Sequence, residues 1–370
     1  MKEWVVKLKN IKKNDLIKSF FIVLFVIACL FVFINEYEIQ YLANGFAKTD
    51  RADLSVYYLD VGQATSTLIV LPNNQSMIID TGSTDSEDEF IESVNLILSH
   101  HKIKEIDYLV LTHSDEDHVG GAEILLKQFQ VFNVFRPKIL SKSKAEIEVS
   151  EQYKVVTTNI YSRVISAVYE EPNCEVEFVE DRTFLIGSEI EIKFFSCQKD
   201  TYSQTNAYSP FVSISCYSRT FLFTGDATAE REEEFVNMIQ DENLEMKVDF
   251  LLVSHHGSKY STTNEFLAAT NPKYAFISAG DNYHPTTEVI NRLKNQGVEE
   301  IYCTKTCGML AVGLNKNGEF FFCTMSFRVE LGFLIVLSAC LFFVILNLDF
   351  GKVKTNYRTD KFLKSRNFKR

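Results

Sequence analysis

The sequence is poor in the residues that usually divide a chain into loosely connected modules. Its 370 residues include only 6 prolines and 15 glycines, and they contain no internal repeat, low-complexity tract or proline-rich linker. These absences exclude repeat architectures and modules joined by flexible linkers. A hydrophobic content of 46% is normal for a packed core, so the length suits one large domain or two small ones.

Positive charge is scarce in the central part of the chain. The first 18 residues carry six lysines against two acids, and the last 20 carry eight Lys and Arg against one acid. Because the whole chain has a net charge of −11, the segment between these ends holds −22. Nucleic-acid binding rests on Lys and Arg that neutralise phosphates, so this balance opposes a polyanionic substrate. Net charge does not show how charge is distributed over the surface. Four residues are candidates for a basic rim around a binding site: Lys259, Lys273, Arg292 and Lys294.

Two long uncharged apolar runs stand near the ends of the chain. They are FFIVLFVIACLFVFI at residues 20–34 and LGFLIVLSACLFFVILNL at residues 331–348. A helix needs about 20 apolar residues to cross a bilayer, so we predict transmembrane helices over 16–35 and 329–348. A cleavable signal peptide is the alternative for the first run, but no clear small-x-small cleavage site follows it closely. A buried core helix is the alternative for the second run, and the basic tail disfavours it.

Basic segments, residues 1–15 and 349–370, flank the predicted spans. Because Lys and Arg accumulate on the cytoplasmic side of membrane proteins, both termini are predicted to be cytoplasmic. Residues 36–327 then form the extracytoplasmic domain of a two-pass cell-membrane protein. This location permits disulfides, and a disulfide or buried thiols on strands are expected for the last cysteines of the domain: Cys303, Cys307 and Cys323. A zinc cluster is the alternative, and the shortage of further ligands nearby disfavours it.

The densest group of potential metal ligands lies in LVLTHSDEDHVGG, residues 109–121. Apolar residues 108–111 predict a short buried strand, and the two glycines before AEILLKQF predict a turn that opens a helix. The loop between them contains His113, Asp115, Asp117 and His118. Imidazole and carboxylate groups at this density indicate a metal site, and a solvated acidic turn is the alternative.

Three further polar loops follow predicted strands. Asp80 ends the apolar run SMIID, Asp226 ends FLFTGD, and the pair His255-His256 follows FLLV at 250–253. Loops at the carboxyl ends of strands are where α/β proteins place their chemistry. Because strands alternate with helices twice along the chain, the sequence predicts two sheets packed face to face, with helices outside.

These motifs, taken in order, resemble a known family. DVGQ, IIDTG, THSDEDHVGG, FLFTGD, SHHGS and a late His-Pro are similar to the metallo-β-lactamase fold, an α/β class whose αββα sandwich gathers such loops at one edge. More narrowly, the order resembles the extracytoplasmic hydrolase domain of ComEC-type competence proteins, which handle DNA during uptake. The resemblance covers residues 54–323 and implies a hydrolase of phosphodiesters.

A centre of two divalent metal ions is implied by this resemblance. It places His113 and Asp115 at one metal, Asp117 and His118 at the second, and Asp226 between both. Because the ligand set mixes imidazoles and carboxylates, manganese is as suitable as zinc.

The remaining site residues are also assigned by the resemblance. His255 is expected to add a metal ligand, and Asp80 is expected to orient ligand side chains from behind. His256 is expected to position substrate or to act as general acid, which makes it a catalytic residue together with Asp117. Asn206 is expected to contact substrate, and for His284 a substrate contact and a structural role stay equally open.

Some features depart from the relatives. Histidine is scarce, with seven residues in all and none between His118 and His255, so the third-motif histidine of β-lactamases is missing. The DVGQ loop continues with Ala64-Thr65-Ser66 where the family usually has Gly-Asp-Ala. Only two predicted spans flank the domain, so the resemblance does not extend to the many-helix channel of competence proteins.

The sequence therefore predicts a membrane-anchored, extracytoplasmic, metal-dependent hydrolase of the phosphodiesterase or nuclease type. Its expected partners are the membrane and a nucleic acid or another phosphodiester. A non-catalytic surface receptor for DNA or another ligand is one alternative, and the dense ligand set disfavours it. A lactamase or thioesterase is another, and the missing histidine disfavours it.

Overall fold

The computed structural model describes residue 20 and residues 22–29, 35–142, 154–155, 158–280 and 283–325 of the chain. Internal contacts divide the chain into two units, residues 37–328 and the terminal segments 1–36 with 329–370. Most of the terminal unit lies outside the described residues, including the predicted span 329–348 and both basic tails.

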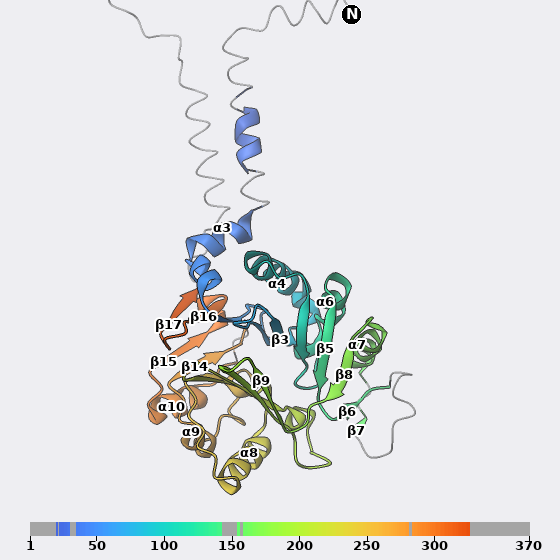
Figure 1. The fold of residues 1–370 in the computed structure, drawn as a ribbon, viewed down its shortest axis with the longest axis vertical. Helices are drawn as coiled ribbons and strands as arrows, with labels where there is room; N and C mark the ends of the chain where they lie inside the picture. Colours follow the sequence, from blue (N-terminus) through green and yellow to red (C-terminus); the bar gives the residue numbers. More distant parts are fainter. Residues whose placement is uncertain are drawn as a thin grey trace, which may run out of the picture. The chain divides into compact units, whose positions relative to one another are not determined.

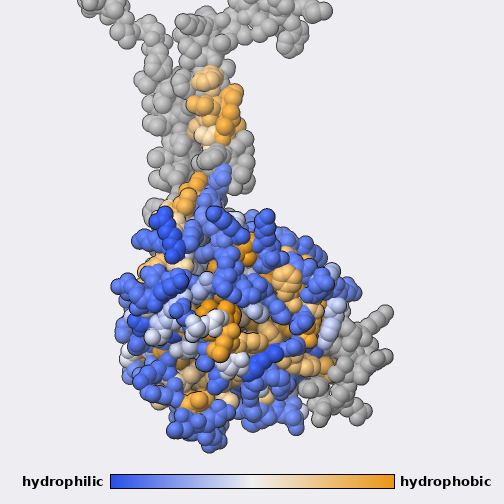
Figure 2. All heavy atoms as spheres, viewed as in Figure 1, coloured by the Kyte–Doolittle hydropathy of each residue, from blue (hydrophilic) through white to orange (hydrophobic). Residues whose placement is uncertain are grey.

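The first predicted span is described only in part. Residues 22–29 are helical, and in Figure 2 they stand out as hydrophobic, whereas the surface of unit 37–328 is mostly hydrophilic in this view. Within the described part of the chain, no helix has the length and apolar character needed to cross a membrane.

Two large sheets form the unit 37–328 (Figure 1). The first has the order β17-β16-β1-β2-β3-β4-β5-β8. Its strands are β1 Leu54–Tyr58, β2 Ser66–Val70, β3 Ser76–Thr81, β4 Ile106–Val110, β5 Val131–Arg136, β8 Glu175–Phe178, β16 Leu310–Leu314 and β17 Phe320–Thr324. The second has the order β15-β14-β13-β12-β11-β10-β9. Its strands are β9 Arg182–Ile186, β10 Ile190–Phe195, β11 Phe211–Cys216, β12 Arg219–Phe223, β13 Phe250–Leu252, β14 Tyr274–Ile277 and β15 Glu300–Cys303. A separate pair consists of β6 Ile139–Leu140 and β7 Lys154–Val155.

Helices cover the outer faces of both sheets (Figure 1). The first sheet packs against α4 Glu87–His101, α6 Ala122–Gln128 and α7 Asn159–Glu170. The second packs against α8 Ala229–Asp241, α9 Asn264–Thr270 and α10 Thr287–Gln296. The shorter elements are α3 Glu36–Ala43, η1 Phe46–Arg51, η2 Thr84–Ser86, α5 Glu116–Val119, η4 Thr205–Tyr208, η5 Ser254–Gly257 and α11 Thr304–Cys307.

Side chains point alternately to the two faces of each sheet, which produces three apolar layers: one between the sheets and one under the helices on each outer face. In β1, Val56 and Tyr58 face the core between the sheets, and Tyr57 faces the core under α4. All five residues of β1 are buried, because a strand in the middle of such a stack has no solvent-facing side. The predicted αββα sandwich is therefore confirmed.

The described cysteines are free thiols, including Cys303, Cys307 and Cys323. Among the alternatives left open by the sequence, this favours buried or partly buried thiols. Burial raises the pKa of Cys216 to about 12 and, with help from Glu171 and Glu175, that of Cys174 to about 11. These two thiols are therefore expected to be unreactive near neutral pH.

Parallel strands bring the predicted site loops to one edge. Strands β3, β4 and β5 are parallel to one another, and so are β12, β13 and β14. Carboxyl ends of neighbouring parallel strands lie side by side, so the loops after β4, β12 and β13 can meet. The spacing of the motifs along the sequence becomes a spatial cluster only through this arrangement.

Candidate metal centre

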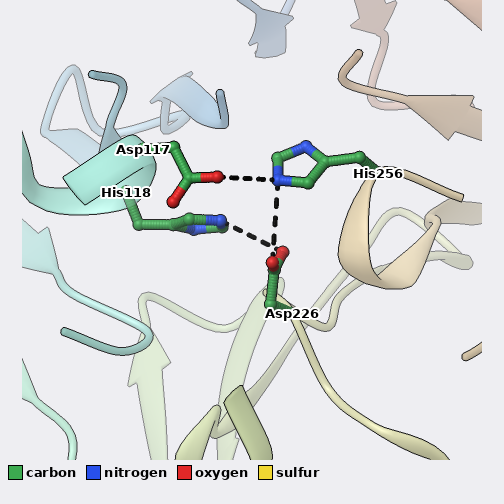
Figure 3. A group of neighbouring side chains, drawn as sticks. All are labelled: Asp117, His118, Asp226 and His256. Atoms are coloured by element: carbon green, nitrogen blue, oxygen red, sulfur yellow. Dashed lines mark ion pairs between the residues drawn. The ribbon is translucent and has the colours of Figure 1, made fainter. Parts of the chain in front are cut away.

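Four side chains from three loops converge at this edge (Figure 3). Asp117 and His118 come from α5 after β4, Asp226 follows β12, and His256 follows β13. One potential ligand atom from each of the four lies within 4.8 Å of the others. His118, Asp226 and His256 are almost fully buried, whereas the Asp117 side chain is 33% exposed. The group is thus closed on the protein side and accessible from outside at Asp117.

Asp80 fixes the imidazole of His118. Its carboxylate accepts hydrogen bonds from the Thr112 amide (2.8 Å) and hydroxyl (2.7 Å), and it lies 2.7 Å from His118 Nδ1. With Nδ1 donating to Asp80, the Nε2 atom of His118 is turned toward Asp226. Asp80 adopts a φ of 58°, a left-handed conformation that Asp tolerates better than most residues. The predicted supporting position of Asp80 agrees with these contacts.

The two glycines of the HVGG motif permit a close backbone approach. A Cβ on Gly120 would lie 2.3 Å from Thr84 N, and one on Gly121 would lie 2.3 Å from Thr81 O. The α5 segment can therefore lie directly on the end of β3 and the loop after it. This contact sets the position of Asp117 and His118 relative to Asp80.

His256 is oriented by a backbone carbonyl. Its Nδ1 lies 2.8 Å from Ser278 O, and a carbonyl can only accept, so Nδ1 donates the hydrogen bond. The Nε2 atom then faces Asp117 Oδ2 at 3.3 Å and Asp226 Oδ2 at 3.6 Å. His256 has a φ of 53° and follows His255 with a φ of 52°, two successive left-handed residues. This uncommon backbone turns the two imidazoles in different directions.

Asp226 lies at the centre of the site. Its Oδ1 is 3.0 Å from His118 Nε2, and its Oδ2 is 3.9 Å from His113 Nε2 and 3.7 Å from His255 Nε2. Asn206, from η4, donates its amide hydrogen to the same Oδ2 at 3.3 Å. One carboxylate thus faces the ring nitrogens of several histidines at once.

Several buried atoms of the site lack a hydrogen-bond partner. Among the described residues, the Nε2 atoms of His113, His118 and His256 and the Oδ1 of Asp226 are unsatisfied. His118 Nε2 and Asp226 Oδ1 are only 3.0 Å apart, yet they are not aligned as donor and acceptor. Leaving buried polar atoms unpaired is costly, and native proteins rarely do so without a reason. Imidazole nitrogens and a carboxylate directed at a common space fit a divalent cation.

The carboxylates and histidines shift one another's pKa. Burial lowers the pKa of His118, but Asp226 and Asp80 outweigh it and raise this pKa well above its usual value. Burial also lowers the pKa of His113, to about 4, with help from His118. For Asp117, burial raises the pKa, but the His256 hydrogen bond and His118 bring it down to about 2. Without metal, a proton on His118 therefore balances the ionised carboxylates.

Comparison with known proteins agrees with this geometry. Residues 59–192 and 201–281 match the model of the metallo-beta-lactamase superfamily. The chain belongs to the metallo-beta-lactamase superfamily. Its described residues carry a candidate metal site, as predicted from the motifs.

Competence proteins are among the curated relatives of this superfamily member. ComE operon protein 3 of Bacillus subtilis is 30% identical over 257 residues, which cover 65% of this chain and 30% of that protein. Competence protein ComA of Neisseria gonorrhoeae is 28% identical over 270 residues, 72% of this chain and 33% of that protein. Recombination protein 2 of Haemophilus influenzae is 26% identical over 241 residues, 64% and 25% respectively. The chain thus spans about a third or less of these relatives, and the resemblance to ComEC-type competence proteins is confirmed.

Among solved structures, the metallo-beta-lactamase fold protein YhfI from Bacillus subtilis is similar at 10% identity, with a TM-score of 0.45. The match covers 73% of this chain and 99% of YhfI.

The candidate site contains most of the residues predicted from the sequence. The four-residue group, however, differs from the predicted set of metal ligands. His113 Nε2 lies 3.9 Å from Asp115 Oδ2, beside the four-residue group rather than within it. His255, the predicted ligand, also lies outside the group, with its side chain 27% exposed. Its neighbour His256, predicted to serve catalysis, lies within the group. The His284 ring is 6.5 Å from that of His255 and 6.4 Å from that of His256, so it borders the site.

Two supporting groups were missed by sequence reasoning. Thr112 bonds to Asp80 and lies 3.0 Å from His113 Nδ1, and Ser278 contributes only its carbonyl oxygen. Thr112 directly precedes the ligand loop, so its position offered a weak indication. A backbone carbonyl carries no residue-type information, so nothing in the sequence indicated Ser278.

Proposed function

We propose that the chain is a metal-dependent phosphodiesterase, anchored in a membrane, whose catalytic unit acts outside the cytoplasm on nucleotide-containing diesters. The observation that carries the proposal is the convergence of Asp117, His118, Asp226 and His256 with buried, unsatisfied nitrogen and oxygen atoms. The curated relatives named for competence and recombination support a substrate related to nucleic acid.

The ligand set fits two divalent ions of the zinc or manganese type. Asp226 faces both His113 and His118. One ion would be held by Asp226 with His113 and Asp115, and a second by Asp226 with Asp117, His118 and His256. Bound ions would supply a more acidic water and polarise a phosphoryl oxygen. Asp80 and Ser278 O hold the His118 and His256 rings, and Asn206 holds the Asp226 carboxylate.

We assign His256 to metal binding because its Nε2 is buried among the carboxylates. The more exposed His255 and His284 then become the residues that meet substrate. His255 is placed to contact the leaving oxygen, since its side chain is 27% exposed and its Nε2 lies 3.7 Å from Asp226.

Membrane anchoring is proposed from the sequence alone, on the two apolar runs and the basic ends. A membrane-impermeant thiol reagent tests the orientation in intact cells. Asp88→Cys, exposed on α4, is expected to be labelled, and Lys364→Cys, in the basic tail, only after the cells are permeabilised. The reverse pattern would overturn the proposed orientation.

Activity is tested with the full chain purified in detergent. We expect manganese- or zinc-dependent hydrolysis of a chromogenic phosphodiester, lost in Asp117→Asn and kept in the matched exposed variant Asp88→Asn. Hydrolysis of a chromogenic lactam instead would move the assignment to another ester or amide. Metal binding without hydrolysis of either substrate would favour the alternative function, a non-catalytic surface receptor.

A further inference from the structure

The loop that follows the two site histidines is tightly held. Arg292, on α10, donates hydrogen bonds to Ser261 O at 2.8 Å and to Lys259 O at 3.0 Å. From α8, the buried Glu232 carboxylate accepts the Thr262 amide at 2.6 Å. The loop is therefore fixed from both sides by helices of the second sheet.

The same loop is attached to the segment that carries Asp226. The Ala229 amide donates to Tyr260 O at 3.2 Å, and the Ser261 hydroxyl donates to Ala227 O at 2.7 Å. The tip of the loop thus lies against both polypeptide segments that supply Asp226 and His256 to the site.

Only the tip of this loop reaches solvent. Ser258, Ser261 and Thr262 are buried, whereas Lys259 and Tyr260 are exposed, with Tyr260 at 69%. The Lys259 ammonium lies 5.1 Å from the centre of the Tyr260 ring. A large aromatic side chain held out in water by a rigid loop loses little conformational freedom when a ligand stacks on it.

A second exposed tyrosine lies in the segment that is hydrogen-bonded to the histidine loop. Tyr283 is 82% exposed and directly precedes His284, whose ring approaches those of His255 and His256. Two residues later, the Thr286 amide donates to Gly257 O at 2.9 Å, which fixes this segment against the loop. Among the described residues, Tyr283 and Tyr260 are the most exposed aromatic side chains, and both lie in segments attached to the histidine loop.

Charge near the site does not support the path of a long polyanion. Two of the basic-rim candidates are used internally, because Lys273 pairs with Asp249 at 2.9 Å and Arg292 binds the loop carbonyls. Beside the ligand loop, a hollow of about 490 Å³ is lined by carboxylates that include Asp60, Asp85, Glu89 and Glu116. Phosphates are repelled on that side. Of the four candidates Lys259 and Lys294 remain, and Lys259 is the one that lies beside Tyr260.

We propose that Tyr260 and Tyr283 stack on the nucleobases that flank the scissile phosphate. The enzyme then selects short single-stranded nucleotide diesters through base stacking, and it does not rely on charge to bind duplexes. The proposal rests on the phosphodiesterase function proposed above. Stacking of bases on aromatic side chains tolerates any sequence and needs an unpaired base, whereas duplex binding depends on many phosphate contacts.

Binding to the full chain in detergent, kept metal-free by a chelator so that no strand is cut, tests the proposal. The probes are fluorescent oligo(dT), the same strand paired with oligo(dA), and an abasic strand of equal length and charge. We expect oligo(dT) to bind at least about tenfold more tightly than either of the other two. The dependence of oligo(dT) binding on salt should be shallow, with a slope of log affinity against log salt of about −0.7, as one lysine contact to a single strand requires.

Substitutions then assign the effect to the two tyrosines. Tyr260→Leu and Tyr283→Leu are each expected to weaken oligo(dT) binding by about tenfold without altering abasic-strand binding, and Tyr260→Trp should retain it. Tyr169→Leu, at a 45% exposed tyrosine on α7, is the matched control and should bind as the unmodified chain does.

Equal binding of the abasic strand and oligo(dT), or unchanged binding by both Leu variants, would overturn the stacking proposal. Because the chelated protein cleaves nothing, this result is separate from the hydrolysis test. Hydrolysis without base preference would refute the stacking proposal alone, and base-dependent binding without hydrolysis would refute the phosphodiesterase function alone.

Discussion

At the residue scale, the adjacent histidines show how backbone conformation assigns roles. His255 and His256 are chemically identical and follow the same strand, so a sequence motif cannot rank them. In the structure both have left-handed φ values, and the resulting turn places one ring at the carboxylates and the other nearer solvent. The Ser278 carbonyl then selects the His256 tautomer that leaves Nε2 free for a ligand role.

A pair of substitutions separates these two roles. His256→Gln is expected to weaken metal binding by about 10- to 100-fold, because it removes an Nε2 atom directed at Asp117 and Asp226. His255→Gln is expected to lower kcat with metal affinity nearly unchanged. Titration calorimetry with manganese and steady-state kinetics on the same samples measure both effects. Weaker metal binding in His255→Gln than in His256→Gln would return the ligand role to His255.

The pKa shifts at the site predict how metal stabilisation depends on pH. Burial lowers the pKa of His256, but Asp226 and Asp117 raise it on balance, and that of His118 is raised as well. Protons on these rings stabilise the metal-free fold fully below their unfolded pKa of about 6.5, and this stability is lost as pH rises through the higher folded pKa. The pKa of Asp226 is held well below its usual value, so it stays ionised throughout this window.

Metal must displace these protons, so the rise in Tm caused by manganese should be larger at about pH 8 than at about pH 6. Scanning calorimetry with and without metal at both pH values measures it. Asp226→Asn is expected to abolish the rise at both. An equal rise at the two pH values in the unmodified chain would contradict the proposed protonation of His118 and His256.

At the element scale, a buried carboxylate on one helix determines the path of the loop after β13. Both oxygens of Glu232 are used, with Thr262 N at 2.6 Å and Thr263 N at 2.8 Å as donors. Thr262 adopts a φ of 55°, which Thr rarely does, and Thr263 caps α9. From sequence, α8 is a polar helix rich in Glu, and only its packing distinguishes the one buried Glu from the half-buried and exposed Glu residues beside it.

Glu232→Gln is therefore expected to lower the free energy of unfolding by about 1–3 kcal/mol, since the new amide N–H would face a backbone N–H inside the protein. Hydrogen exchange should rise in residues 258–263. Glu233→Gln, on the exposed side of the same helix, is the control and should change neither quantity. Equal effects of the two substitutions would mean that the loop does not depend on this carboxylate.

At the scale of the whole molecule, the two sheets pack through aromatic residues that belong to strands far apart in the sequence. Tyr58, on β1, stacks on Phe276, on β14, with ring centroids 4.3 Å apart. The Tyr58 hydroxyl is buried and has no hydrogen-bond partner among the described residues. Burial of a hydroxyl without a partner opposes folding, whereas burial of the ring favours it.

Tyr58→Phe is consequently expected to leave stability unchanged or to raise it by up to about 1 kcal/mol, because it removes only the unsatisfied hydroxyl. Phe276→Ala should cost about 3–5 kcal/mol through the cavity it leaves between the sheets. Chemical denaturation of the full chain in detergent measures both. A loss of more than about 1 kcal/mol in Tyr58→Phe would show that the hydroxyl has a partner.

Much of the fold could be predicted because strand and helix patterns are local. The apolar run at 108–111 and the glycines after the ligand loop predicted β4 and the turn before α6, and the alternating elements predicted the sandwich. Strand order could not be derived in this way, since β1 pairs with β16 across more than two hundred residues of sequence. Only the burial of three apolar layers together selects that pairing.

By itself, the sequence determined the types of ligand, their loops and their place after strands, because residue chemistry and hydrophobic period are carried by short stretches of chain. Tertiary structure alone decided that Asp226 faces several histidines, that His256 rather than His255 joins Asp117, and that Tyr260 stands exposed on a fixed loop. These outcomes depend on backbone turns and on hydrogen bonds from other elements, such as Ser278 O and Glu232. The physical reason is that orientation arises from contacts between distant segments, which no single stretch of sequence contains.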